Sequence, residues 1–285
     1  MTRLDGKVAF ITGAARGQGR AHALRLARAG ADILALDVCG PVAPTPYPPS
    51  TRTELEETKA LVSGEGRRIV TRVVDVRDFK AMDSLCRDGA AELGGIDVVV
   101  ANAGINNWNR FWEMSEEQWN TLIDINLTGV WKTLKATAPI MIEQGRGGSI
   151  ILVSSVAGLK ALPAQAHYVS AKHALVGLTK AAAIELGPHQ IRVNSIHPWG
   201  VDTPMGHDDT LIDLVARFPT YAASLSAILA EPILASPDTI ADAVLWLAGD
   251  ESRTVTGAQI PLDMGATRVL CDLLVHGGRP TSRKR

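Results

Sequence analysis

The sequence predicts a single α/β domain built on a doubly wound, seven-stranded parallel sheet with helices on both faces. Short apolar runs alternate along the chain with longer segments of helical period, which is typical of repeated strand–helix units. The 285 residues, 46% of them apolar, can bury a full-sized core, and no shift in composition marks a second domain. Right-handed crossovers between parallel strands then place helices on both faces of the sheet.

Each expected strand is a short apolar run, and each expected helix is a longer segment in which apolar residues recur at helical spacing. The strands are expected near 7–12, 32–36, 69–74, 96–101, 148–153, 191–196 and 258–262. The helices are expected over 17–29, 53–64, 78–93, 116–143, 166–187 and 238–248. The regular alternation of the two kinds of element favours a parallel sheet over a hairpin arrangement.

Two stretches interrupt this alternation within the expected domain, 1–265. The insert 38–52 is rich in proline and longer than the usual 2–6 residues of a connection. The stretch 198–237 contains five prolines and follows a strand. Because long loops at the carboxyl ends of strands bind ligands in open α/β sheets, 198–237 is the expected substrate loop. The tail 266–285 ends in a basic segment and is expected to be disordered.

The charge balance and the cysteines exclude several classes of protein. With 29 basic and 30 acidic residues, the chain has no general field that would recruit nucleic acid or a membrane surface. Cys39, Cys86 and Cys271 are widely separated and lack the spacing of metal ligands, so no metal site is expected. No leader-like segment and no apolar stretch of about 18 residues is present. We expect a cytoplasmic protein whose partner is a small molecule.

The stretch TGAARGQG, residues 12–19, follows the first expected strand and opens the first expected helix. Glycines in such a turn let the backbone approach a pyrophosphate, and the helix N-terminus favours its charge. An ordinary turn is the alternative, but the place between a strand and a helix favours a dinucleotide site in a Rossmann fold. The residues expected at this site are Gly13, Arg16, Gly17, Gln18 and Gly19.

Asp37 ends the second expected strand, where a carboxylate can accept hydrogen bonds from both hydroxyls of an adenosine ribose. The same carboxylate would repel a 2′-phosphate, which favours NAD over NADP as the cofactor. Arg16 argues the other way, because a basic residue in the glycine loop can attract that phosphate. The electrostatic repulsion between Asp37 and a 2′-phosphate is stronger than the attraction that a flexible, solvated Arg16 provides, so Asp37 is the stronger indication.

The motif YVSAK, residues 168–172, places a phenol and an ammonium group on one face of an expected helix. A phenol of pKa about 10 catalyses proton transfer near neutral pH only when positive charge stabilises the phenolate. Taken alone, such a pair is usually a solvated helix face. Here Tyr168 and Lys172 follow Ser155, which ends an expected strand, and a glycine loop precedes all three.

In these motifs the chain resembles the short-chain dehydrogenase/reductase family over about residues 5–265. The resemblance implies an oxidoreductase in which Tyr168 is the general acid–base and Lys172 tunes the phenol and binds the nicotinamide ribose. Ser155 would hydrogen-bond the substrate oxygen. Asn126, within DINLTGV, matches a family asparagine that holds a water in a proton path. The alternative for Asn126 is a buried amide that satisfies backbone groups, and both roles can hold together.

Further family positions match this sequence in order. The resemblance implies that the following residues line the adenine, pack against the cofactor or meet the nicotinamide carboxamide: Asp75, Val76, Asn102, Ala103, Gly104, Val201 and Thr203. One position departs from the family, which commonly has Pro-Gly where this chain has Pro198-Trp199. Trp199 therefore either walls the nicotinamide pocket or packs under the loop.

The proline-rich insert, with PYPPST followed by TRTELEET, resembles the carveol-dehydrogenase-like group linked to the redox cofactor mycofactocin. The stretches TGAARGQGR and HPWGVDTPM resemble the same group. The resemblance implies oxidation of secondary alcohols with an NAD that does not readily exchange, so that an external electron carrier removes its electrons. Prolines lower the entropy lost when a loop is fixed over a ligand, and Tyr47 is expected over the adenosine end. A solvent-exposed spacer or a subunit contact is the alternative.

Apolar residues around the expected substrate loop favour an apolar alcohol or ketone, such as a terpenoid or a steroid-like ring. The candidates are Trp108, Leu159, Trp199 and Met205, and each could equally pack within the core. A catalytically silent NAD-binding sensor or scaffold and a freely exchanging ketone reductase are the alternative functions. In the family, helices matching 116–143 and 166–187 build subunit interfaces, which implies a homotetramer.

Overall fold

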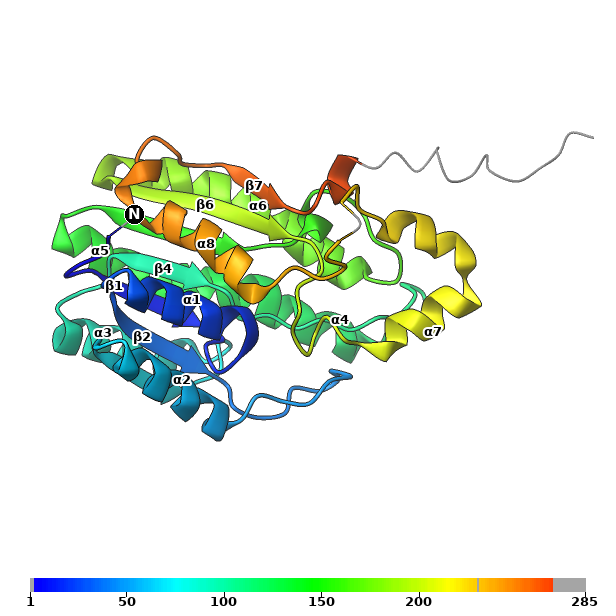
Figure 1. Ribbon diagram of the computed structural model, residues 1–285, viewed down its shortest axis with the longest axis horizontal. Helices are drawn as coiled ribbons and strands as arrows, with labels where there is room; N and C mark the ends of the chain where they lie inside the picture. The colour runs from blue at the N-terminus through cyan, green and yellow to red at the C-terminus, as the bar shows by residue number, and fades with distance from the viewer. Residues whose placement is uncertain (1–2, 230, 269–285) are drawn as a thin grey trace, which may run out of the picture.

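The computed structural model describes residues 3–229 and 231–268, and its centre is a seven-stranded parallel sheet (Figure 1). The strand order is β3-β2-β1-β4-β5-β6-β7, so the direction of winding reverses between β1 and β4. The strands are β1 (Val8–Thr12), β2 (Asp32–Asp37), β3 (Ile69–Val73), β4 (Val98–Ala101), β5 (Gly148–Val153), β6 (Ile191–Pro198) and β7 (Gln259–Leu262). The expected fold class is confirmed.

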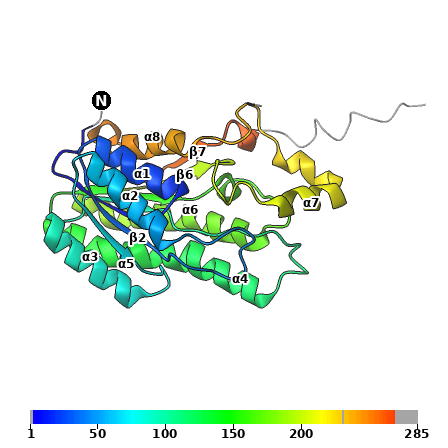
Figure 2. The same ribbon diagram turned by 60° about the horizontal axis from the view of Figure 1, so that its bottom comes forward.

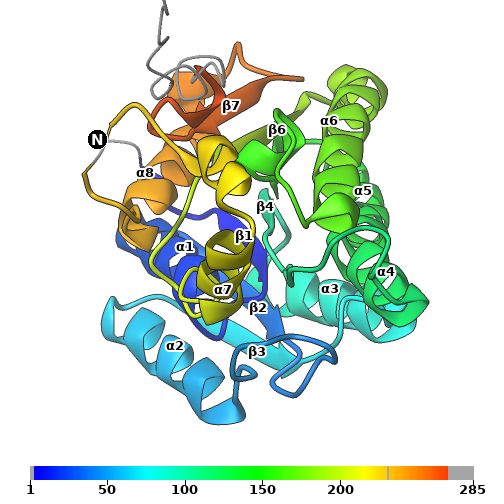
Figure 3. The same cartoon turned by 90° about the vertical axis from the view of Figure 1, so that its right-hand side faces the viewer.

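Helices cover both faces of the sheet (Figures 2 and 3). One layer contains α1 (Gly17–Arg28), α2 (Arg52–Gly64) and α8 (Pro237–Ala248), and the other contains α3 (Phe79–Leu93), α4 (Glu116–Ile123), α5 (Val130–Gln144) and α6 (Ala166–Leu186). Two apolar clusters fill the space between these layers and the sheet. Because the central strands β1, β4 and β5 are buried from both sides, they read as nearly continuous apolar runs rather than as alternating ones, whereas the edge strands β3 and β7 are only partly buried.

Local signals fix the ends of several helices. Thr51 and Glu54 form a capping box at the start of α2, where each side chain hydrogen-bonds the backbone N–H of the other residue. Asp78 caps α3 by accepting a hydrogen bond from the N–H of Ala81, and Gly94 ends that helix in the left-handed conformation. The start of α2 fixes the end of the insert 38–52, which reaches from β2 to this helix.

The expected helix over 116–143 is not continuous. A π-helical stretch over Asp124–Gly129 separates α4 from α5. Asn126 lies in this stretch, is fully buried, and exchanges two hydrogen bonds of 2.8 Å with the backbone of Ile105. A wider turn is typical of functional positions in helices. One extra residue in a turn hardly changes the apolar periodicity, which is why the sequence predicted a single helix.

The expected loop 198–237 contains helical structure. It includes α7 (Asp209–Arg217) and a 3-10 helix over Pro219–Leu225. The Asp208 side chain accepts a hydrogen bond from the N–H of Thr210 at the start of α7. Within the expected tail, residues 266–268 form a short 3-10 turn, and the expectation for 269–285 lies outside the described residues. None of the helices described is long and apolar enough to cross a membrane.

Candidate active site

A pocket lies at the carboxyl edge of the sheet, beside the reversal between β1 and β4, where open α/β sheets bind ligands. The glycine loop forms one wall. A Cβ at Gly19 would lie 1.9 Å from the carbonyl oxygen of Gly13, so this approach of helix to strand requires glycine. Gly13 itself has φ of +70°. The loop therefore leaves backbone, rather than side chains, facing a ligand at the N-terminus of α1.

Twelve of the expected cofactor-binding residues line this one pocket. They are Gly13, Arg16, Gly17, Gln18, Gly19, Asp37, Asp75, Val76, Asn102, Ala103, Gly104 and Thr203. Val201 is buried and joins Ala235 in an isolated β-bridge outside this lining. The buried Oε1 atom of Gln18 has no hydrogen-bond partner among the described residues. A dinucleotide fits a pocket that combines the backbone of the glycine loop, the carboxylate of Asp37 at the end of β2 and the unpartnered amide oxygen of Gln18.

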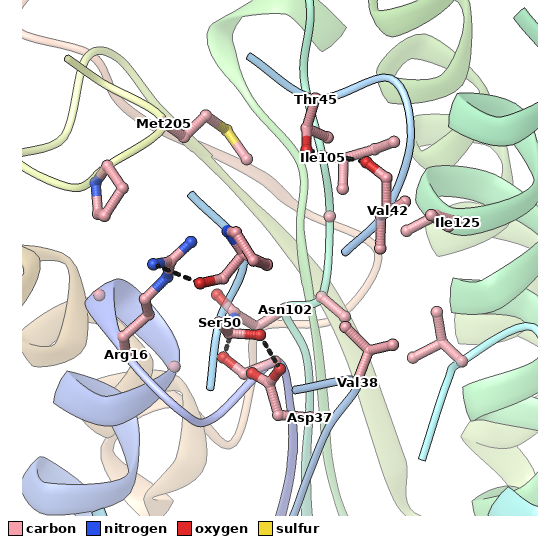
Figure 4. Close-up of a pocket in the computed structure, with 18 of the residues that line it drawn as sticks. Arg16, Asp37, Val38, Val42, Thr45, Ser50, Asn102, Ile105, Ile125 and Met205 are labelled. Atoms are coloured by element: carbon pink, nitrogen blue, oxygen red, sulfur yellow. Dashed lines mark hydrogen bonds between the residues drawn. The ribbon is translucent and has the colours of Figure 1, made fainter. Parts of the chain in front are cut away.

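Asp37 is fixed at the end of β2 (Figure 4). Its buried carboxylate accepts hydrogen bonds from the N–H of Ala15 at 3.0 Å, from the N–H of Cys39 at 3.1 Å and from the hydroxyl of Ser50 at 2.6 Å. A carboxylate has about four acceptor positions, so a ribose hydroxyl can still be bound. The charge at the predicted ribose position is thus held in place by both the glycine loop and the insert.

Arg16 turns toward the insert. Its guanidinium donates hydrogen bonds to the carbonyl oxygens of Pro48 and Pro49, and it lies 3.6 Å from a carboxylate oxygen of Glu54. These contacts give Arg16 a role in fastening the insert, as the dashed line in Figure 4 illustrates. From the sequence, Asp37 indicated NAD and Arg16 argued for a 2′-phosphate. In the structure, both side chains form hydrogen bonds with the insert.

Tyr47 carries the insert across the pocket to the loop that follows β4. Its ring lines the pocket, and its hydroxyl accepts a hydrogen bond from the N–H of Asn106 at 3.0 Å. Burial raises the pKa of Tyr47 to about 12. The insert is therefore fastened at the glycine loop, at the end of β2 and at the loop after β4. The sequence gave no signal for the last of these contacts, because residues 47 and 106 lie far apart in the chain.

The structure brings Ser155, Tyr168 and Lys172 together. Ser155 follows β5, and its hydroxyl accepts a hydrogen bond from the N–H of Ala157 at 3.1 Å. Tyr168 and Lys172 lie one turn apart in α6, with Nζ of Lys172 5.4 Å from the centre of the Tyr168 ring. The Lys172 ammonium donates to the carbonyl oxygen of Val153 at 2.8 Å. The three residues thus lie near the carboxyl end of β5, with Tyr168 and Lys172 supplied by α6.

Burial acts on both ionisable groups of this cluster. It raises the pKa of Tyr168, while a hydrogen bond with Ser155 opposes that shift. Burial lowers the pKa of Lys172 to about 7. Both shifts disfavour the charged form, as desolvation does in general. The electrostatic attraction between an ammonium at Lys172 and a phenolate at Tyr168 acts against the desolvation of both groups.

The expected substrate residues are placed differently from one another. Met205 lines the pocket. The backbone N–H of Trp199 donates a hydrogen bond to the carbonyl oxygen of Leu262. Nζ of Lys160 lies over the Trp199 ring, 5.1 Å from the ring centre. Leu159 ends a short turn after Ser155, and the buried indole N–H of Trp108 has no partner among the described residues. The structure does not bring Trp108, Leu159 and Trp199 into the lining of the first pocket.

A second, mostly apolar pocket lies beside α6. Its lining includes Phe111, Trp112, Leu162, Val169 and Tyr221. Val169 of this lining follows Tyr168, the expected acid–base, in the sequence. Tyr221 was not among the expected residues, because it belongs to a 3-10 helix that apolar periodicity does not predict. In the described residues no group of His, Cys, Asp or Glu could hold a metal ion.

A glycine-lined pocket at the reversal of a doubly wound sheet, together with adjacent Ser, Tyr and Lys, defines a dinucleotide-dependent oxidoreductase. A family model described as enoyl-(acyl carrier protein) reductase matches residues 13–267. An uncharacterized NAD-dependent oxidoreductase of Mycobacterium tuberculosis is 53% identical over 267 residues, which cover 93% of this chain and 97% of the relative. The chain belongs to the short-chain dehydrogenase/reductase family, and the expected oxidoreductase class is confirmed.

Two solved structures have the same fold. A short-chain dehydrogenase from Mycobacterium paratuberculosis bound to NAD has a TM-score of 0.91 and 50% identity, covering 93% of this chain and 99% of that one. Carveol dehydrogenase from Mycobacterium avium in complex with NAD has a TM-score of 0.88 and 48% identity, with the same two shares covered. This chain is therefore similar to a carveol dehydrogenase along nearly its whole length.

Proposed function

We propose that this protein is an NAD-dependent dehydrogenase that oxidises an apolar secondary alcohol to a ketone, or reduces the ketone in reverse. The observation that carries the proposal is the cluster of Ser155, Tyr168 and Lys172. The cluster adjoins the glycine-lined pocket, because Tyr47 of the pocket lining interacts electrostatically with Tyr168. NAD as the cofactor is confirmed by the relatives, because one is named NAD-dependent and two similar structures contain NAD. Asp37 is the residue that would hold its adenosine ribose.

In the oxidation, the Tyr168 phenolate takes the proton of the substrate hydroxyl, whose oxygen is held by the hydroxyl of Ser155. Lys172 stabilises the phenolate by its charge. NAD, when bound, supplies the acceptor for the hydride that leaves the carbinol carbon. Asn126 would hold a water that passes the proton onward, and this role is compatible with its two hydrogen bonds to Ile105. Ketone reduction follows the same path in the opposite direction.

The remaining cofactor contacts follow from the lining of the pocket. Asp75 and Val76 would border the adenine, and Asn102 to Gly104 would pack against the cofactor along the carboxyl end of β4. Thr203 would meet the nicotinamide carboxamide from the loop after β6, with Val201 supporting that loop from behind. Gln18 would direct its unpaired amide oxygen toward the cofactor or its bound water.

The protein would keep its NAD tightly bound. Three groups of hydrogen bonds support this: from Arg16 to Pro48 and Pro49, from Ser50 to Asp37, and from Asn106 to Tyr47. Because the insert is held by hydrogen bonds at three places, these bonds must break together before a ligand in the pocket can leave. Electrons would then pass from the bound cofactor to an external electron carrier.

Retention of NAD is tested by purifying the protein without added nucleotide, denaturing it and measuring the NAD released. About one NAD per chain supports the proposal. A protein that emerges empty, and that binds and releases NAD rapidly in solution, contradicts tight binding but leaves the dehydrogenase proposal standing.

The substrate would be an apolar ring alcohol of terpenoid or steroid-like kind. Similarity to a carveol dehydrogenase supports this class, as do Met205 in the first pocket and Leu162 in the second. Trp108, Leu159 and Trp199 would contribute only by packing around these pockets. A panel of alcohols, assayed with free NAD and separately with an artificial electron acceptor, tests the class. Turnover of short polar alcohols alone would contradict it.

We expect a cytoplasmic homotetramer whose functional domain spans 1–265, with 266–285 as an appended tail. Exposed apolar side chains on the outer helices support subunit contacts: Trp119 and Trp131 on α4 and α5, and Ile184 on α6. Light scattering of the purified protein tests the assembly. A monodisperse monomer would contradict it.

A further inference from the structure

A chain of hydrogen bonds joins the insert to the start of the catalytic helix. The Asn107 side chain donates from Nδ2 to the carbonyl oxygen of Pro44 at 3.2 Å, and its Oδ1 lies 2.8 Å from Nε2 of His167. Nδ1 of His167 accepts a hydrogen bond from the N–H of Tyr168 at 2.9 Å. Both side chains are buried, with exposed fractions of 4% for Asn107 and 0% for His167.

The direction of every bond in this relay, Pro44–Asn107–His167–Tyr168, is determined by its ends. The N–H of Tyr168 can only donate, so Nδ1 of His167 carries no proton and Nε2 carries one. Nε2 therefore donates to Oδ1 of Asn107, which leaves Nδ2 to donate to a carbonyl oxygen that can only accept. Burial lowers the pKa of His167 to about 4, against the opposing effect of a hydrogen bond to the backbone of Gln165, so the imidazole is neutral at physiological pH.

The relay also completes the first turn of α6. The first N–H groups of a helix have no partner within it, and Gln165 at the N-cap makes no side-chain hydrogen bond. His167 satisfies one of these groups, the N–H of Tyr168, with its own ring. The backbone of the catalytic tyrosine is therefore oriented by a side chain whose own orientation depends on Asn107.

Beyond Asn107, the relay reaches the same insert that Tyr47 fastens. Tyr47 binds the backbone of Asn106, and Pro44 is bound by the side chain of the next residue. Two adjacent residues of the loop after β4 thus hold two positions of the insert. The contact through Asn107 continues to α6 by hydrogen bonds, whereas Tyr47 interacts with Tyr168 electrostatically.

We propose that His167 is a positioning residue for Tyr168, and that Asn107 makes its position depend on the insert. The insert closes over the cofactor pocket, and the same closure sets the orientation of the catalytic tyrosine. The inference rests on the proposed dehydrogenase activity and adds to it a link between cofactor cover and proton transfer. Tyr168 would then be correctly oriented for proton transfer only when the insert is closed over the cofactor.

Two substitutions separate this coupling from simple capping of the helix. Asn107→Ala removes the link to the insert while the His167 side chain remains present but loses the partner of its Nε2 atom. His167→Asn retains a short side-chain acceptor for the N–H of Tyr168 but cannot reach Asn107. Because both break one chain, the double variant should be no worse than either single variant, which is the mark of residues that act as a unit. Asn109→Ala, in the same loop but outside the relay, is the matched control.

The coupling predicts that each single variant lowers kcat about tenfold while KM for the alcohol changes less than about twofold, because a misplaced acid–base group slows chemistry more than binding. Release of bound NAD should become faster in Asn107→Ala, and Asn109→Ala should match the unmodified protein. Thermal unfolding checks that each variant is folded. Should Asn107→Ala not fold, Asn107→Ser, which shortens the side chain out of reach of both partners, takes its place.

Hydrogen exchange measured on the protein without alcohol supplies a readout independent of turnover. Asn107→Ala should speed exchange in the insert 38–52 and in residues 165–169 together. Unchanged exchange at 165–169, unchanged kcat in Asn107→Ala, or losses in the two variants that multiply would each overturn the coupling. A protein without dehydrogenase activity would instead overturn the proposed function, and the exchange result would still decide whether the insert and α6 are linked.

Discussion

The hydroxyl of Ser50 lies 2.6 Å from the carboxylate of Asp37, so the last residues of the insert are bound to the residue expected to hold the adenosine ribose. The contact joins Asp37, which is expected to select NAD, to the insert, which is expected to cover it. A charged acceptor makes this a stronger hydrogen bond than a neutral pair would form. In the proposed function, the choice of NAD and its retention therefore both depend on the carboxylate of Asp37.

Ser50→Ala should weaken the retention of NAD. Hydrogen bonds to charged groups contribute about 1.5–3 kcal/mol, which corresponds to release faster by roughly 10- to 100-fold if the bond holds the closed insert. Release is followed by the change in fluorescence when bound NADH is displaced by excess NAD. Ser63→Ala, on the exposed face of α2, is the control. Equal release rates in the two variants would show that Ser50 does not hold the insert closed.

Tyr168→Phe should abolish most turnover and leave NAD bound. General acid–base groups contribute about 10²–10⁴-fold to rate, and phenylalanine retains the ring while removing the hydroxyl that exchanges the proton. Turnover of the alcohol and the NAD content of the same preparation are measured in parallel. Turnover within a few-fold of the unmodified enzyme would rule out Tyr168 as the acid–base. Loss of NAD together with turnover would show a binding role instead.

Lys172 should make folding more favourable as pH rises. Its folded pKa is about 7, whereas the unfolded value is about 10.4, so between these values the unfolded chain binds more protons. The free energy of unfolding should then rise from about pH 7 to pH 10, by up to about 1.4 kcal/mol per pH unit from this group. Denaturant unfolding of the unmodified protein and of Lys172→Met gives the two slopes. Parallel curves would mean that Lys172 is not desolvated as the structure indicates.

His22 should make the protein sensitive to acid. It is fully buried in α1, both ring nitrogens lack partners among the described residues, and burial lowers its pKa to about 3. Because the unfolded pKa is about 6.5, stability contributed by the neutral ring is lost as pH falls from about 6.5 to 3. His22→Leu should flatten this loss in urea unfolding, by up to about 1.4 kcal/mol per pH unit. An unchanged slope would contradict the desolvated, neutral ring.

The sequence predicted the sheet well because the central strands β1, β4 and β5 are buried on both faces and read as nearly continuous apolar runs, and the edge strands follow the same strand–helix alternation. Every expected strand begins and ends within two residues of the observed one. Two misses concern the helices. The π-helical turn at Asn126 adds one residue without changing the apolar face, and α7, which buries Leu214 and exposes Ile212, lies in a proline-rich stretch whose composition favoured a loop.

The sequence predicted those parts of the site whose residues lie close together in the chain, such as the glycine loop and the pair Tyr168 and Lys172. The site was not predictable where contacts join distant segments. Arg16 looked like a residue that could bind a phosphate, but its guanidinium is engaged by carbonyl oxygens of the insert. His167 precedes Tyr168 in the sequence, but only the fold brings Asn107 to its ring.

The central claim is that the fastened insert keeps a working NAD in place over Ser155, Tyr168 and Lys172. The direct measurement adds an apolar secondary alcohol to extensively dialysed protein, without NAD or an electron acceptor, and follows the absorbance of reduced nicotinamide. We predict formation of about one equivalent of NADH per chain, which remains with the protein on gel filtration. No reduction until free NAD is supplied, with the NADH then appearing in solution, would contradict the claim.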